Sequence, residues 1–70
     1  MKKLHIRDEF IKLGQALKLA GIAENGVDAK EQILSGEVFV NGESENRRGR
    51  KLYPGDQVSV GVEEFEIANS

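Results

Sequence analysis

The spacing of apolar residues changes along the chain and marks out its first elements. Residues 3–7 alternate polar and apolar side chains, which predicts a short strand. From residue 10 the apolar positions recur every three or four residues, which predicts a helix over about residues 11–20 that ends at Gly21. The residues that form the apolar face of this helix are Phe10, Leu13, Leu17 and Ala20.

A second helix is predicted from near Gly26 to Ser35 and Gly36. Asn25 can accept a hydrogen bond from the first turn, and Asp28 stands where a capping box has its acidic residue. Because the two helices are short and closely linked, we expect them to pack together as a hairpin. The expected buried side of the second helix is made of Ala29 and Ile33, with Val27 and Leu34.

Beyond residue 37 the apolar period falls to two. Val38 and Val40 precede Asn41-Gly42, a pair that tolerates the positive φ angles of a tight turn, so a strand and a turn are predicted. Residues 54–56, Pro-Gly-Asp, predict a second turn. Alternation over residues 58–62 and 65–67 predicts a hairpin around residues 61–63. This order predicts an α+β domain with a helical pair packed on a small, mostly antiparallel sheet.

Length and composition narrow the class of protein. Seventy residues fit one domain, residues 1–70, with a small core. The absence of cysteine excludes disulfides, thiolate nucleophiles and cysteine-ligated zinc. We find neither a signal peptide nor an apolar run of about 20 residues, so we expect a cytoplasmic monomer that does not contact membranes.

The charge is unevenly distributed. The formal net charge of -2 argues against a nucleic-acid partner, yet residues 46–51 hold four of the ten basic residues and no acid. The other residues then carry six basic and twelve acidic groups. Guanidinium groups crowded in a loop repel one another and match phosphate well. The alternative is a solvated turn with weak surface ion pairs to Glu43 and Glu45.

Three ordered segments resemble the S4 RNA-binding domain. They are residues 13–21 (LGQALKLAG), 29–42 (AKEQILSGEVFVNG) and 51–58 (KLYPGDQV). Residues 17–21, together with the basic segment 46–52, resemble the small stand-alone bacterial S4 proteins of the YaaA and YbcJ type. The resemblance implies an S4-like fold with its αL motif. It also implies binding of structured RNA, often ribosomal, by the helical pair and the adjoining strand and loop.

The resemblance further implies which residues contact RNA. Lys18 and Lys30 lie where S4 domains present polar or basic groups to phosphates, and Asn41 matches a turn asparagine whose role can equally be structural. The basic loop adds Asn46, Arg47, Arg48, Arg50 and Lys51. Two features depart from the family: residues 24–28 are acidic and apolar where Arg or Lys is common, and Phe39 replaces a polar residue. Phe39 can stack on a base, but packing in a hydrophobic patch is favoured.

Other chemistries have little support in the sequence. His5 is the only histidine and has no nucleophile motif beside it, so we interpret it as a surface residue. The three acids Glu63, Glu64 and Glu66 fit the solvent face of a strand better than a metal site, and no cofactor is expected. A β-grasp sulfur carrier is not expected, because residues 67–70 lack the Gly-Gly end. The remaining hypotheses are a non-catalytic RNA-binding protein or, alternatively, a protein–protein adaptor whose acidic surface docks on the ribosome or an assembly intermediate.

Overall fold

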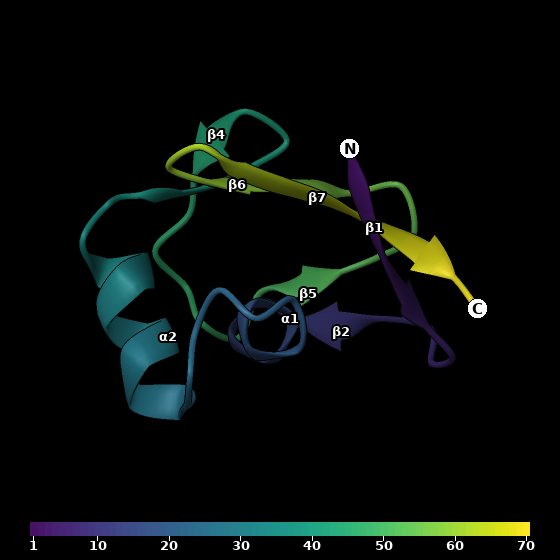
Figure 1. Ribbon diagram of the computed structural model, residues 1–70, viewed down its shortest axis with the longest axis horizontal. Coiled ribbons are helices and arrows are strands. Elements are labelled where there is room, and N and C mark those ends of the chain that lie inside the picture. The colour runs from purple at the N-terminus through teal and green to yellow at the C-terminus, as the bar shows by residue number, and fades with distance from the viewer.

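The computed structural model describes residues 1–70 and contains seven short strands and two helices (Figure 1). In chain order the elements are β1 (Lys2–Ile6), β2 (Ile11–Lys12), α1 (Leu13–Leu19), α2 (Gly26–Leu34), β3 (Val38–Val40), β4 (Glu43–Ser44), β5 (Lys51–Leu52), β6 (Gln57–Val60) and β7 (Glu63–Asn69). The predicted α+β class is confirmed.

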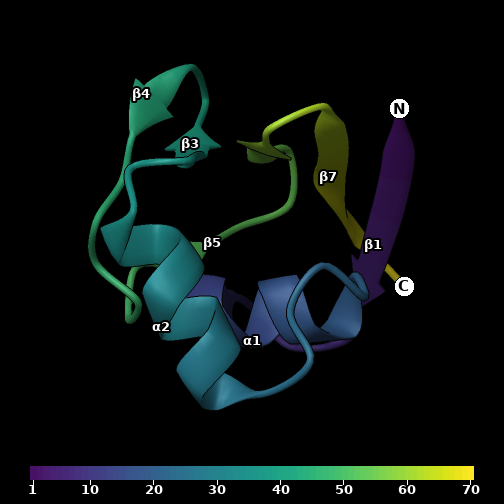
Figure 2. The ribbon, with the colours of Figure 1, turned by 60° about the vertical axis from the view of Figure 1, so that its left-hand side comes forward.

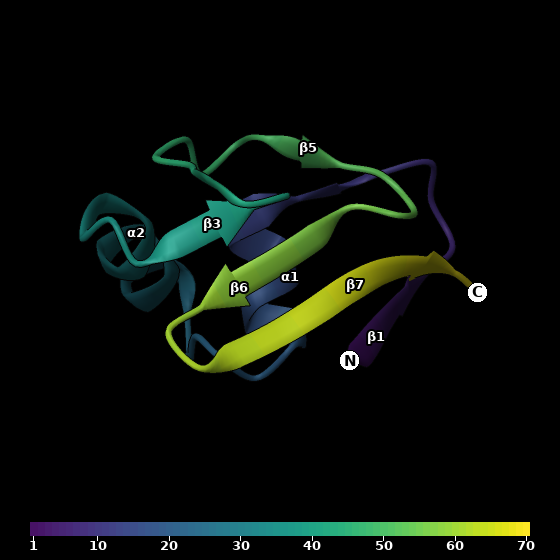
Figure 3. The same ribbon diagram turned by 90° about the horizontal axis from the view of Figure 1, so that it is seen from above.

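Five of the strands form one sheet in the order β1-β7-β6-β3-β4. β1 runs parallel to β7, with Lys2 opposite Phe65, whereas every other pair in this sheet is antiparallel. Seen from above, β3, β6 and β7 lie over α1 (Figure 3). The sheet is therefore mixed but mostly antiparallel, as the sequence predicts.

The two helices pack against each other and close one side of the sheet. α1 is seen end-on in Figure 1, while α2 stands beside it, so the helices cross at a steep angle, which Figure 2 shows from another side. One apolar cluster fills the space between helices and sheet. Its largest fully buried side chains include Phe65, Leu13, Leu17, Ile33, Leu52 and Ile67.

The start of α2 follows the predicted cap. The Asn25 side chain accepts a hydrogen bond from the Asp28 N–H at 2.9 Å, and the Asp28 carboxylate accepts one from the Glu24 N–H at 2.9 Å. Ala29 and Ile33 are buried, whereas the expected burial of Val27 and Leu34 is wrong: both are exposed. Only the narrow stripe of α2 that carries Ala29 and Ile33, four residues apart, faces the core.

The largest local difference from expectation lies at residues 11 and 12, which were predicted to be helical. They form β2, and Ile11 lies opposite Leu52 of β5 in a separate two-stranded sheet. The backbone of Lys12 is extended, at φ -76° and ψ 145°, so α1 begins only at Leu13. A contact between distant parts of the chain thus overrides the local helical pattern. Val62, predicted to lie on a strand, is fully exposed in the turn between β6 and β7.

The cap of α2 gives a direct test of this part of the fold. Replacing Asn25 by alanine removes the acceptor for the Asp28 N–H and should lower the free energy of unfolding by about 1 kcal/mol. In a domain of this size the melting temperature should fall by about 4–8 °C. Asn25→Asp keeps an acceptor and serves as the control. Equal melting temperatures for Asn25→Ala and the wild type would contradict the assigned cap.

Candidate nucleic-acid interface

The basic loop, residues 46–51, is docked on the start of α1. The Leu13 N–H donates to the Arg50 carbonyl at 2.8 Å, and the Gly14 N–H donates to the Arg48 carbonyl at 3.0 Å. These carbonyls occupy two of the N–H groups that a helix start leaves free, and α1 has no side-chain cap there. A Cβ atom on Gly14 would lie 2.7 Å from Cγ of Arg48, so glycine permits this close approach.

Glu45 directly precedes the basic loop and is the one charged residue of the protein that is buried, with 5% of its surface exposed. Its carboxylate accepts hydrogen bonds from the backbone N–H, Nε and Nη2 of Arg47, each at 3.0 Å, and from Nη1 of Arg50 at 2.9 Å. The Arg47 side-chain hydrogen bonds, with help from Arg50, outweigh the effect of burial and lower the pKa of Glu45 to about 2. The same hydrogen bonds raise the pKa of Arg47.

The three loop arginines therefore differ in how much of the side chain is free to bind a ligand. Arg50 is held inside, with 30% of its side chain exposed, while Arg47 bonds Glu45 yet keeps 72% of its side chain exposed. Arg48 forms no ion pair. The expected ion pairs to Glu45 exist, but they join a buried carboxylate, and Glu43 takes part in none.

Beside Arg48 the surface forms a groove of about 310 Å³ between α1, the start of α2 and the basic loop. Lys12 and Lys18 of the α1 region line it together with Arg48, and no acidic residue does. None of these three cations makes a side-chain hydrogen bond or an ion pair within the protein. We call this surface the cationic groove.

The first residue of α2, Gly26, also lines the cationic groove. Asn25 caps the Asp28 N–H, so the helix geometry leaves the N–H groups of residues 26 and 27 without a partner in their own helix. A helix start carries partial positive charge and binds anions. Although residues 24–28 lack the basic side chain expected there, their backbone adds to the positive field made by Lys18 and Arg48. The groove is suited to a phosphate group.

The other predicted contact residues lie outside the cationic groove. Lys30 and Asn46 are exposed. Asn41, at φ 53°, donates to the Asp56 carboxylate at 3.1 Å and accepts from the Gln57 N–H at 2.9 Å, so both ends of its amide are engaged. The ammonium of Lys51 lies 4.7 Å from the ring centre of Phe10. That these residues contact RNA stays a prediction.

The structure also identifies residues that the sequence reasoning missed. Lys12 and Gln15 line the cationic groove beside Lys18. Residues three apart on a helix share a face, so the pair at positions 15 and 18 was a usable signal. The predicted helix over residues 11–20 puts Lys12 on the same face at the same spacing, although in the structure Lys12 lies on β2, before the helix begins.

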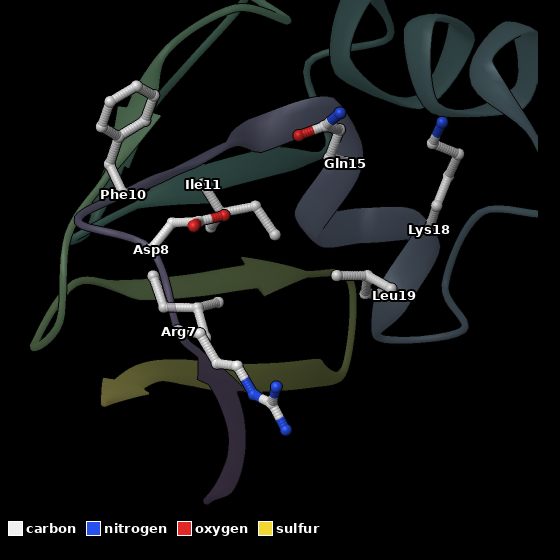
Figure 4. Close-up of a pocket in the computed structure, with 8 residues that line it drawn as sticks. Arg7, Asp8, Phe10, Ile11, Gln15, Lys18 and Leu19 are labelled. Atoms are coloured by element: carbon white, nitrogen blue, oxygen red, sulfur yellow. The ribbon is translucent and has the colours of Figure 1, made fainter. Parts of the chain in front are cut away.

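A second hollow, of about 380 Å³, adjoins the cationic groove across α1 (Figure 4). Gln15 and Lys18 line both depressions. Phe10 stands at one end of the second hollow and Leu19 at the other (Figure 4). We call it the α1 pocket.

Comparison with known proteins identifies a family and related sequences. The sequence model of the S4 domain matches residues 4–68. A Bacillus subtilis protein named probable ribosome maturation protein RlbA is 48% identical over 67 residues, which cover 94% of each chain. A Schizosaccharomyces pombe protein, small ribosomal subunit protein uS4m, is 39% identical over 49 residues, which cover 70% of this chain but 15% of that protein.

A solved structure matches as well. It is the solution structure of YbcJ from E. coli, described as revealing an αL motif involved in RNA binding. The TM-score is 0.67 with 31% sequence identity, and the match covers 96% of this chain and 84% of YbcJ. The resemblance inferred from the three sequence segments is confirmed.

The buried carboxylate of Glu45 predicts a particular dependence of stability on pH. Glu45→Gln should lower the free energy of unfolding at neutral pH by about 1 to 3 kcal/mol, the range for lost hydrogen bonds to a charged group. The pKa of Glu45 is lowered from 4.5 to about 2, so its contribution is complete above pH 4.5 and is lost as the pH falls from there towards 2. The difference in the free energy of unfolding between the wild type and Glu45→Gln, measured by urea titration, should therefore shrink over that pH range.

Glu43→Gln is the matched control, since Glu43 is exposed and unpaired two residues away. It should leave both the stability at neutral pH and its pH dependence close to those of the wild type. Equal behaviour of the two variants would contradict the role given to Glu45.

Proposed function

The chain belongs to the S4 domain family, and from this premise we propose that it is a non-catalytic RNA-binding protein of the bacterial cytoplasm that binds structured ribosomal RNA. The match to the family over residues 4–68 supports RNA binding. The names of the two relatives, a probable ribosome maturation protein and a small ribosomal subunit protein, support ribosomal RNA as the target. We further propose that residues 1–70 act as one domain and as a monomer.

The cationic groove is the observation that carries this proposal. Lys12, Lys18 and Arg48 converge there without a carboxylate to neutralise them. Most contacts between proteins and nucleic acids go to phosphates and sugars, and paired RNA is recognised mainly through its shape and backbone. A groove with separated cations and free backbone N–H groups can follow such a backbone without reading its sequence.

The basic loop supports the groove in two ways. Arg48 contributes a free guanidinium, and the exposed part of Arg47 can reach a neighbouring phosphate while Glu45 holds its other side. Arg50 acts mainly inside the protein. Lys30, Asn41, Asn46 and Lys51 stay candidates for contacts at the margin of the interface.

Salt dependence tests this proposal. For a stem-loop of ribosomal RNA, Arg48→Gln and Lys18→Gln should each weaken binding and reduce the slope of log affinity against log salt by about 0.7 to 0.9, because each removes one phosphate contact. Fluorescence anisotropy at several salt concentrations measures the slope. Lys3→Gln changes the charge equally but lies on β1, away from the groove, and should keep the wild-type slope. The proposal fails if Arg48→Gln and Lys18→Gln also keep that slope.

A second candidate function, that of a protein–protein adaptor, rests on the open face of the sheet. Side chains alternate between faces along a strand. Val38, Val58 and Phe65 are buried against the helices. Their neighbours Phe39, Ser59 and Glu64 lie opposite one another on adjacent strands and face away. Glu66 lies on the same face opposite Lys3 of β1, so the surface carries two acids against one lysine, together with the exposed ring of Phe39. Such a surface suits a basic protein on the ribosome or an assembly intermediate.

Charge reversal tests the adaptor. Changing Glu64 and Glu66 to lysine should remove protein partners that are captured from nuclease-treated extract, because the surface would then repel a basic protein. Reversal of two acids elsewhere, Glu24 and Glu31, is the control for net charge. Capture of the same proteins by both variants and the wild type would exclude the adaptor function.

A further inference from the structure

The α1 pocket combines an apolar floor with polar groups that have no partner. Ile11 and Leu19 contribute apolar surface, and Phe10 is the aromatic residue of the lining. Asp8, Gln15 and Arg7 also line it and make no side-chain hydrogen bond or ion pair within the protein. Such a mixture binds a flat ligand that needs both apolar contact and hydrogen bonds at its edge.

The position of the α1 pocket connects it to the cationic groove. Gln15 and Lys18 belong to both, and Figure 4 shows the Lys18 amino group pointing towards α2, on the groove side. In a nucleotide the ribose joins the phosphate to the base, so a nucleotide whose phosphate is bound at Lys18 can place its base on the far side of α1.

The aromatic side of the α1 pocket is held in place by its neighbours. The ring centres of Phe10 and Tyr53 are 5.9 Å apart and tilted by 50°. The Lys51 ammonium lies over the Phe10 ring, in cation–π geometry. These contacts restrain the ring before a ligand arrives, which lowers the entropic cost of stacking a base on the face that Lys51 does not cover.

We propose that the α1 pocket accepts one unpaired nucleobase of an RNA whose phosphates lie in the cationic groove. This inference rests on the proposed RNA-binding function and adds a second site to it. A nucleotide is favoured over an apolar peptide side chain, because Asp8 and Gln15 line the pocket with polar groups that have no partner, and Lys18 at its border points its ammonium into the adjoining cationic groove. Unpaired bases are the parts of RNA that stack on aromatic rings and expose their hydrogen-bonding edges.

The test compares two RNA hairpins that differ only by one unpaired adenosine inserted in the stem. The wild type should bind the bulged hairpin at least about fivefold more tightly, the lower end of the range for stacking one base on an aromatic side chain. Phe10→Leu removes the ring but keeps apolar volume, and Leu19→Ala shortens the opposite wall. Both should reduce the affinity ratio of the two hairpins to near one while the salt slope stays unchanged.

Leu34→Ala is the matched control for Leu19→Ala. Each leucine is the last residue of its helix, and their exposed fractions, 63% and 67%, are similar, but Leu34 lines neither depression. The control should keep the wild-type ratio, and circular dichroism verifies that each variant is folded. Leu19→Ala keeps the test decisive if Phe10→Leu does not fold, because Leu19 is largely exposed.

Three results would overturn the proposal. One is a wild-type ratio near one with a normal salt slope, in which case RNA binding stands without the base pocket. Another is a ratio that survives both pocket variants, as expected if the pocket accepts a protein side chain and the bulge is read elsewhere. The third is failure of the wild type to bind either hairpin, which would also remove the proposed function.

Discussion

The interaction on which the candidate interface depends is the burial of one carboxylate among arginines. Glu45 accepts hydrogen bonds from both Arg47 and Arg50, so a loop of like charges that would repel itself takes a single shape. That shape presents two backbone carbonyls to the start of α1. Arg48, which follows Arg47 without a carboxylate of its own, is left facing the groove. Glu45 thus supports the cationic groove through the shape of the loop, although it does not line the groove itself.

The basic residues that lack an acidic partner are gathered more closely in the folded structure than along the sequence. Glu45 neutralises part of the loop, and Lys12 and Lys18 of the distant α1 region replace that charge. The positive surface is therefore built from two segments about 30 residues apart, which the β2–β5 pairing and the loop carbonyls bring together. Glu64 and Glu66 lie elsewhere, on the open face of the sheet. A net charge of -2 is compatible with a binding surface of the opposite sign.

Much of this arrangement follows from local sequence rules. The cap at Asn25, the turn at Asn41 and the alternation around Phe65 are short-range signals, and all three elements are present. The predictions that fail depend on contacts between residues that are far apart in the sequence. Ile11 pairs with Leu52 in a strand, and Glu45 is buried because the loop folds over it, and neither event is encoded in nearby residues. The resemblance to the S4 domain, not a local rule, assigns Lys18 to the candidate site, whereas Lys12 is brought there by the pairing of β2 with β5.

The parallel pairing of β1 with β7 has a consequence for how the chain acquires its structure. Lys2 faces Phe65, so nearly the whole chain lies between the paired residues. Closing so long a loop lowers the entropy of the chain before the strand pairing can stabilise it. The hairpins β3–β4 and β6–β7 need only short loops. β1 has no other neighbour in the sheet, so during translation it stays unpaired until residues 63–69 have been synthesised.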